Sequence, residues 1–210
     1  SSATITLTLG SHKKTLLVIV ENKVKKISYS KKQLTLKKRK NKNYFELALK
    51  EMLVEYYSQA DEALKALRQT GYGKMYNNAL EHKNLNHGSY NHHNIVLLNG
   101  KIAMINMSKI NYAPAIQDVY DYLRKVMEKY HWKQKTGQNI LEAYESVRQL
   151  KPDEREYLCL RLAYPEKFWK TASAYSRSNK AWLPEKSVEK LQTAVEQTKE
   201  KEVFLREVFE

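Results

Sequence analysis

The strongest constraint on the fold is an apolar stripe that recurs at the helical period between residues 45 and 67. Its members are Phe45, Leu49, Met52, Leu53, Tyr56, Ala60, Ala63, Leu64 and Leu67. A helix of more than six turns with such a stripe needs partners that cover it, because helix propensity alone does not hold it in water. Gly71 follows as a helix stop. The stripe therefore predicts a long helix within a packed, multi-helix body.

An Asn-Gly pair lies between two strand-like runs, residues 95–98 and residues 101–105. A two-residue hairpin turn of type I′ needs positive φ at both central positions, and Asn99-Gly100 is a preferred pair for that turn. This pattern predicts a tight antiparallel hairpin inside the helical body.

Most of the remaining body has helical periodicity. A second stripe contains Ile116, Val119, Tyr120, Leu123, Val126, Met127 and Tyr130. Further helices are predicted at about 137–149, 153–163, 165–178 and 185–207, and Pro152, Pro165 and Pro184 lie where a first helical turn tolerates proline. The predicted fold class is therefore α+β, a mainly helical body with an embedded β-hairpin.

The positive charge divides the chain into two regions. Residues 1–43 contain 12 basic residues and one acidic residue, a net charge of +11, whereas residues 44–210 carry only +3. Alternation at 3–9 and β-branched runs before residue 30 predict short strands, and residues 31–43 read as a solvated linker. We therefore predict a basic, strand-containing segment at 1–43 and a helical domain at 44–210.

Composition excludes several classes of protein. The apolar runs are too short to cross a bilayer, so no membrane association is expected. A single cysteine, Cys159, excludes a disulfide framework and Cys-rich zinc modules. No secretory signal is visible, which predicts synthesis in the cytoplasm. Only Tyr29 is aromatic within residues 13–42 and no nucleic-acid motif is present, so specific nucleic-acid binding is not expected.

Two short motifs flank the predicted hairpin. Before it stands His87-Gly88-Ser89, followed by four residues and Asn94, and after it stands Ile105-Asn106-Met107. This order resembles the C-terminal lobe of kinase-like phosphotransferases of the aminoglycoside and choline kinase type. In that superfamily the first motif reads His-Gly-Asp, four residues and Asn, and the second reads Ile-Asp-Phe or similar. The resemblance implies a kinase-like C-lobe, with 1–43 as a reduced or incomplete N-lobe.

The resemblance places the catalytic aspartate of the superfamily at Ser89 and its metal-binding aspartate at Asn106. A serine hydroxyl is a poor base near neutral pH, and an amide brings no negative charge to a magnesium site. Between Glu81 and Asp118 the sequence has no acidic residue. We therefore predict a pseudokinase: no enzymatic activity, no catalytic residue, no metal and no cofactor. His87 is expected to brace the loop, with Asn94 as a vestigial nucleotide-site residue.

Two stretches in the tail, residues 164–170 and 178–182, resemble those of CotS-type spore coat proteins, which belong to the same superfamily. This resemblance, over roughly residues 44–200, implies a structural or assembly role in the spore coat, with other coat proteins as partners. It also implies a spore coat location.

Alternative readings remain open. One is a residual ATP-dependent phosphotransferase acting on a small molecule or a polysaccharide. Another is a polyanion-binding module that uses residues 13–42 to hold an anionic partner through counterion release. A third is a transition-metal site built from His82, His87, His92 and His93, whose spacing matches no zinc template.

Overall fold

The computed structural model describes residues 44–177 and 185–209. The strands predicted within 1–30, the linker at 31–43 and the motif at 178–182 lie outside the described residues. The described part is mainly helical with two small antiparallel sheets. The helical body and one of the sheets, the hairpin, agree with the sequence prediction. Among the described helices, none combines the length and apolar composition that a bilayer crossing requires.

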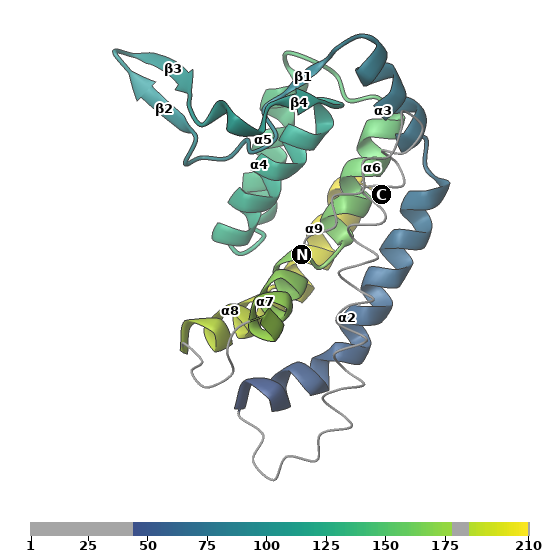
Figure 1. Cartoon of the computed structure of the whole chain (residues 1–210), viewed down its shortest axis with the longest axis vertical. Coiled ribbons are helices and arrows are strands. Elements are labelled where there is room, and N and C mark those ends of the chain that lie inside the picture. The colour runs from purple at the N-terminus through teal and green to yellow at the C-terminus, as the bar shows by residue number, and fades with distance from the viewer. Residues whose placement is uncertain (1–43, 178–184, 210) are drawn as a thin grey trace.

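Along the described part of the chain, two helices come first, the short strands follow as one group, and the remaining helices come last, as Figure 1 shows. The helices are α2 (Tyr44–Gln69), α3 (Tyr72–Glu81), α4 (Ile116–Lys129), α5 (Gln134–Glu145), α6 (Pro152–Ala163), α7 (Glu166–Arg177), α8 (Glu185–Glu196) and α9 (Thr198–Phe209), with a short 3-10 turn, η1 (Met107–Lys109). The strands are β1 (Leu85–Asn86), β2 (Ile95–Leu98), β3 (Lys101–Met104) and β4 (Asn111–Tyr112).

The first hydrophobic core joins α2 to α7 and α8. The predicted stripe of α2 is buried from Leu49 onward, and Phe168 and Trp169 of α7 pack against it with Leu191 of α8. The ring of Tyr56 stacks on that of Phe168 with centroids 4.0 Å apart. The long helix is therefore covered along its apolar face, as its length demands.

The second core lies between α4, α5, α6 and α9. Leu123 and Met127 of α4, Leu158 of α6 and Phe204 of α9 are almost completely buried there. Gly137 of α5 lies against the ring of Phe204, where a Cβ atom would collide with it. The absence of a side chain at Gly137 therefore allows α5 to approach α9 closely.

Strands β2 and β3 form the predicted hairpin, which Figure 1 shows projecting beyond the helices. Leu98 pairs with Lys101, and the turn residues Asn99 and Gly100 have φ of 49° and 75°. Both values are positive, so the type I′ prediction is confirmed.

The structure corrects several predicted elements. The helix predicted at 185–207 is divided at Gln197 into α8 and α9, and α5 spans Gln134–Glu145 rather than 137–149. Helix α3 and the two-residue strands β1 and β4 were not predicted. Tyr130, assigned to the buried stripe of 116–130, is 46% exposed because α4 ends at Lys129 and the chain turns there.

Candidate functional site

The loop at 87–94 leaves strand β1 and leads into the hairpin. Strand β1 pairs with β4, with Asn86 opposite Asn111, so the start of the loop is fixed to the segment that follows the hairpin. Gly88 has φ of 70°, and a Cβ atom there would collide with the carbonyl oxygen of Lys109. Only glycine suits both the backbone conformation and the space.

Asp118, in the first turn of α4, anchors this loop. Its carboxylate oxygens accept hydrogen bonds from the backbone N–H of His87 at 2.7 Å and of Gly88 at 3.1 Å. Burial raises the pKa of Asp118, and the two backbone hydrogen bonds oppose that rise. The helix N-terminus also favours the ionised carboxylate. Asp118 therefore serves to shape the loop.

Both ring nitrogens of His87 are engaged within the same loop. Nε2 donates to the carbonyl oxygen of Ile105 at 2.9 Å, and Nδ1 accepts from the backbone N–H of Ser89 at 3.2 Å. One neutral tautomer satisfies both contacts. His87 thus ties the loop to the end of the hairpin and has no nitrogen left to accept a substrate proton.

The structure brings Ser89, Asn94 and Asn106 together across the hairpin. Asn94 Nδ2 donates to the Ser89 carbonyl oxygen at 2.8 Å and lies 3.4 Å from Ser89 Oγ. Asn106 Nδ2 donates to Asn94 Oδ1 at 2.7 Å, from a left-handed backbone with φ of 61°. Asn91, which the sequence analysis missed, also donates to the Ser89 carbonyl oxygen at 2.8 Å.

The oxygen atoms of this site do not fit an ordinary magnesium site. The site offers amide, hydroxyl and carbonyl oxygens, and Asn94 Oδ1 is already an acceptor for Asn106. Magnesium sites of this kind rely on one or two carboxylates. Within residues 44–177 and 185–209, no group of three or more His, Cys, Asp or Glu residues is placed to hold a metal ion. The alternative four-histidine site therefore has no support in the described part of the chain.

Exposed apolar side chains surround the site. Leu97, Leu98 and Ile102 on the hairpin are 72%, 58% and 76% exposed, and Met107 and Ile110 beyond it are each near 45%. Large exposed apolar patches mark binding surfaces in proteins. Sequence reasoning missed this feature because an Ile-Val-Leu-Leu run is typical of a buried strand.

No protein-family model and no curated protein matches the sequence. Among solved structures, the chain is similar to an aminoglycoside phosphotransferase from Alicyclobacillus acidocaldarius subsp. acidocaldarius, with a TM-score of 0.76 and 16% sequence identity. The match covers 92% of this chain and 56% of that one. The described fold is therefore the kinase-like fold of an aminoglycoside phosphotransferase, and the chain spans just over half the length of the structure it matches.

This comparison contradicts the prediction that the chain is not an enzyme. That prediction relied on the loss of two carboxylates, at Ser89 and Asn106. The fold is instead shared with an aminoglycoside phosphotransferase, a class of enzymes. The physical reason for the error is that side-chain identity at two positions was taken to decide the whole site, whereas Asp118, His87 and Asn94 still hold the loop in a defined shape.

Proposed function

We propose that this chain forms the helical lobe of a phosphotransferase that transfers a phosphoryl group from ATP to a hydroxyl group of a small molecule or a polysaccharide. The observation that carries the proposal is the hydrogen-bonded network of Ser89, Asn94 and Asn106 on a loop anchored by Asp118. The fold shared with an aminoglycoside phosphotransferase supports it.

Phosphoryl transfer depends mainly on positioning and electrostatics, because its transition state is loose and needs little covalent help from the protein. Ser89 Oγ, at the position of the catalytic aspartate, can orient an acceptor hydroxyl by a hydrogen bond but cannot take its proton. Loss of a general base slows such reactions by roughly 10²- to 10⁴-fold. We therefore expect slow transfer.

The charge around the site favours a polyphosphate. The sequence has no acidic residue between Glu81 and Asp118, while Lys101 and Lys109 lie on the hairpin and just beyond it. Asn94 and Asn106 amide groups provide further hydrogen-bonding capacity at the base of the hairpin. The exposed side chains of Leu97 and Ile102 offer an apolar surface of the kind on which a nucleobase packs.

Calorimetric titration of the full chain with ATP tests the binding step. We expect ATP to bind, and Asn94→Ala to weaken binding at least tenfold because it removes the residue that joins Ser89 to Asn106. Asn139→Ala, on an exposed position of α5, is the matched control and should bind as the parent does. A folded parent chain that gives no binding heat would contradict the proposal.

We further propose that the protein is located in the spore coat, with other coat proteins as its partners. Residues 13–42 would bind an anionic partner among them. The support is the tail resemblance at residues 164–170. Tyr164, Phe168 and Trp169 of that stretch are buried, so their resemblance reflects packing and not an exposed contact surface. Immunoblots of extracted spore coats test the location. The same blots on a strain whose protein lacks residues 13–42 test whether that segment is needed. Absence of the protein from the coat fraction would contradict the location.

A further inference from the structure

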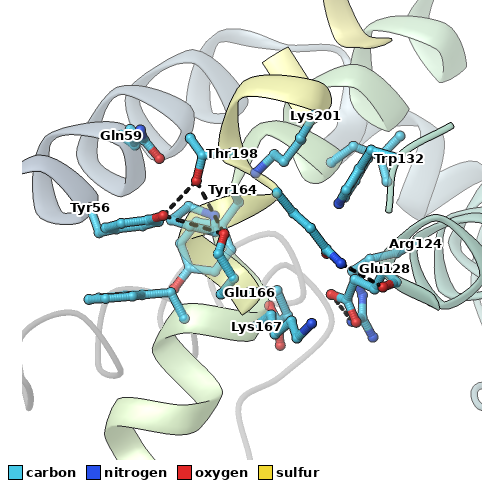
Figure 2. A pocket seen from close by; sticks show the side chains of 15 residues that line it. Tyr56, Gln59, Arg124, Glu128, Trp132, Tyr164, Glu166, Lys167, Thr198 and Lys201 are labelled. Atoms are coloured by element: carbon cyan, nitrogen blue, oxygen red, sulfur yellow. Dashed lines mark hydrogen bonds and ion pairs between the residues drawn. The ribbon is translucent and has the colours of Figure 1, made fainter. Parts of the chain in front are cut away.

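A pocket whose lining includes several charged side chains lies where α2, α4, α7 and α9 meet, away from the loop at 87–94. Arg124 and Glu128 of α4 line one side, Lys167 of α7 another, and Lys201 of α9 a third, as Figure 2 shows. Asp118 and Glu128 are ten residues apart on α4, which corresponds to roughly 15 Å along the helix. The pocket is therefore distinct from the candidate site, and a ligand bound in it would not depend on the proposed phosphotransferase activity.

The carboxylates of the pocket already have cationic partners. Glu128 pairs with Arg124 at 2.7 Å, and Glu166 pairs with Lys170 at 3.1 Å. Lys201 Nζ donates to the carbonyl oxygen of Ala163 at 2.7 Å and lies 5.8 Å from the centre of the Trp132 ring. Within residues 44–177 and 185–209, neither Lys167 nor Lys201 has a carboxylate at ion-pair distance, so two ammonium groups are left there without an anion.

Burial makes these ammonium groups costly. It lowers the pKa of Lys167 and lowers the pKa of Lys201 to about 8, and nearby Glu128 only partly offsets it in both cases. Both lysines are half-buried, and a partly desolvated charge without an anionic partner is unfavourable, so a bound anion would stabilise both groups.

Two further donors of the pocket lining lack an acceptor in the described part of the chain. Arg124 is 5% exposed and its Nε has no hydrogen-bond partner, and Tyr164 is 2% exposed and its hydroxyl has none. Buried polar atoms are nearly always hydrogen-bonded, so an unpaired one points to a missing ligand or water. Here the unpaired groups are a guanidinium N–H and a hydroxyl, and two lysines line the same pocket, so an oxygen-bearing anion matches the chemistry of all four groups.

We propose that this pocket binds a small oxyanion, either free or as the terminal group of a larger ligand, between Lys167, Lys201 and Arg124. The pocket is partly open to solvent and has a volume of about 30 Å³, which has room for one or two water-sized groups. That size fits a phosphate or carboxylate head, and the open side would leave the rest of a larger ligand in solvent. Phosphate and carboxylate share the required chemistry, and the experiment separates them.

Calorimetric titration of the full chain with inorganic phosphate, and separately with acetate at equal ionic strength, tests the site. Lys201→Met and Lys167→Met should each weaken binding at least tenfold. Lys199→Met, at an exposed position of the same helix α9, should leave it unchanged. Because residues 1–43 are strongly basic and also attract anions, the difference between Lys201→Met and Lys199→Met is the decisive quantity. If phosphate binds more tightly than acetate, the anionic group that the pocket binds is a phosphoryl group. If acetate binds more tightly, it is a carboxylate.

A second variant keeps the test meaningful if a lysine variant folds poorly. Glu128→Gln removes a carboxylate from the pocket lining, so it should strengthen phosphate binding, a gain that misfolding does not produce. Binding of neither anion by the folded parent chain would overturn the oxyanion site, and so would equal losses in Lys201→Met and Lys199→Met. Either result would leave the ATP titration at the loop unaffected, so the two proposals fail separately.

Discussion

Asn106 Nδ2 donates a hydrogen bond to Asn94 Oδ1 at 2.7 Å, across the base of the β2–β3 hairpin. Asn106 stands where the resemblance to kinase-like phosphotransferases places a metal-binding aspartate. An amide pair is held together without a cation, because one partner donates and the other accepts. A carboxylate at position 106 would instead need a cation between the two oxygens. The site therefore has an arrangement that stands without a metal ion.

Asn106→Asp should make this part of the chain depend on magnesium. The variant places a carboxylate oxygen against Asn94 Oδ1, and loss of the hydrogen bond should lower the free energy of unfolding by about 0.5–1.5 kcal/mol. Millimolar Mg²⁺ should restore the lost free energy of unfolding, because a cation between the two oxygens would attract both of them. Thermal melts with Mg²⁺ and with EDTA measure the effect, and Asn139→Asp on α5 is the control. If Mg²⁺ does not change the melting temperature of the variant, the proposal that an aspartate at position 106 needs a cation is wrong.

Asp118→Asn should loosen the loop at 87–94. The amide keeps the shape of the carboxylate, but its NH₂ group would face a backbone N–H of His87 or Gly88. We expect a loss of about 1.5–3 kcal/mol in the free energy of unfolding, as for a hydrogen bond to a charged group. Asp61→Asn, an exposed partner of Lys65, should cost well under 1 kcal/mol. Urea titrations measure both, and faster amide exchange at His87 and Gly88 should accompany the first. Equal costs would contradict the anchoring role.

Gly88→Ala and Gly100→Ala separate backbone strain from steric collision. Both glycines have positive φ, but a Cβ atom at Gly88 would meet the backbone of Lys109, whereas nothing lies within 4 Å of one at Gly100. Backbone strain alone should lower the free energy of unfolding by about 1–2 kcal/mol in Gly100→Ala. In Gly88→Ala the steric collision should lower it by a further 1–3 kcal/mol or so. Chemical denaturation of the two variants provides the comparison. A larger loss at Gly100 would mean that the loop is not packed as described.

The proton equilibrium of Lys201 should contribute more to stability as pH rises in alkaline solution, whereas buried tyrosines such as Tyr72 and Tyr164, whose pKa burial raises, act in the opposite direction. The pKa of Lys201 is lowered to about 8 in the fold, from an ordinary value of 10.5, mainly by burial. Between these values the unfolded chain binds a proton that the folded chain does not, so the free energy of unfolding increases with pH. Glu128 on α4 and Glu202 on α9 oppose the shift. Lys201→Met should show a smaller increase between pH 8 and pH 10 than Lys199→Met in urea titrations. Identical increases would show that Lys201 titrates normally.

Local sequence signals predicted those elements whose structure depends on neighbours in the chain. The apolar stripe marked α2, and Asn99-Gly100 marked the hairpin because the turn itself requires positive φ. The break at Gln197 carries no Gly or Pro and was missed. Its side chain donates to the carbonyl oxygen of Glu128, 69 residues away, so the break goes with a tertiary contact. Helix α3 was missed because Gly73 and two asparagines weaken its helical pattern.

The candidate site was predicted in part for a similar reason. Its loop residues lie within 20 positions of one another on either side of one hairpin, so a motif could gather Ser89, Asn94 and Asn106. The oxyanion pocket gave no such signal. Arg124, Lys167 and Lys201 are spread over 77 positions and line one pocket only because the tertiary fold brings α4, α7 and α9 together.

The most direct test of the proposed function is a single-turnover measurement of ATP consumption by the full chain, with water as the phosphoryl acceptor. We predict slow release of phosphate that Asn94→Ala abolishes. We also predict a rate at least about 100-fold higher in the Ser89→Asp, Asn106→Asp double variant with Mg²⁺, because it restores a general base. Absence of phosphate release from both the parent chain and the double variant, each folded, would contradict the assignment of phosphoryl transfer to this site.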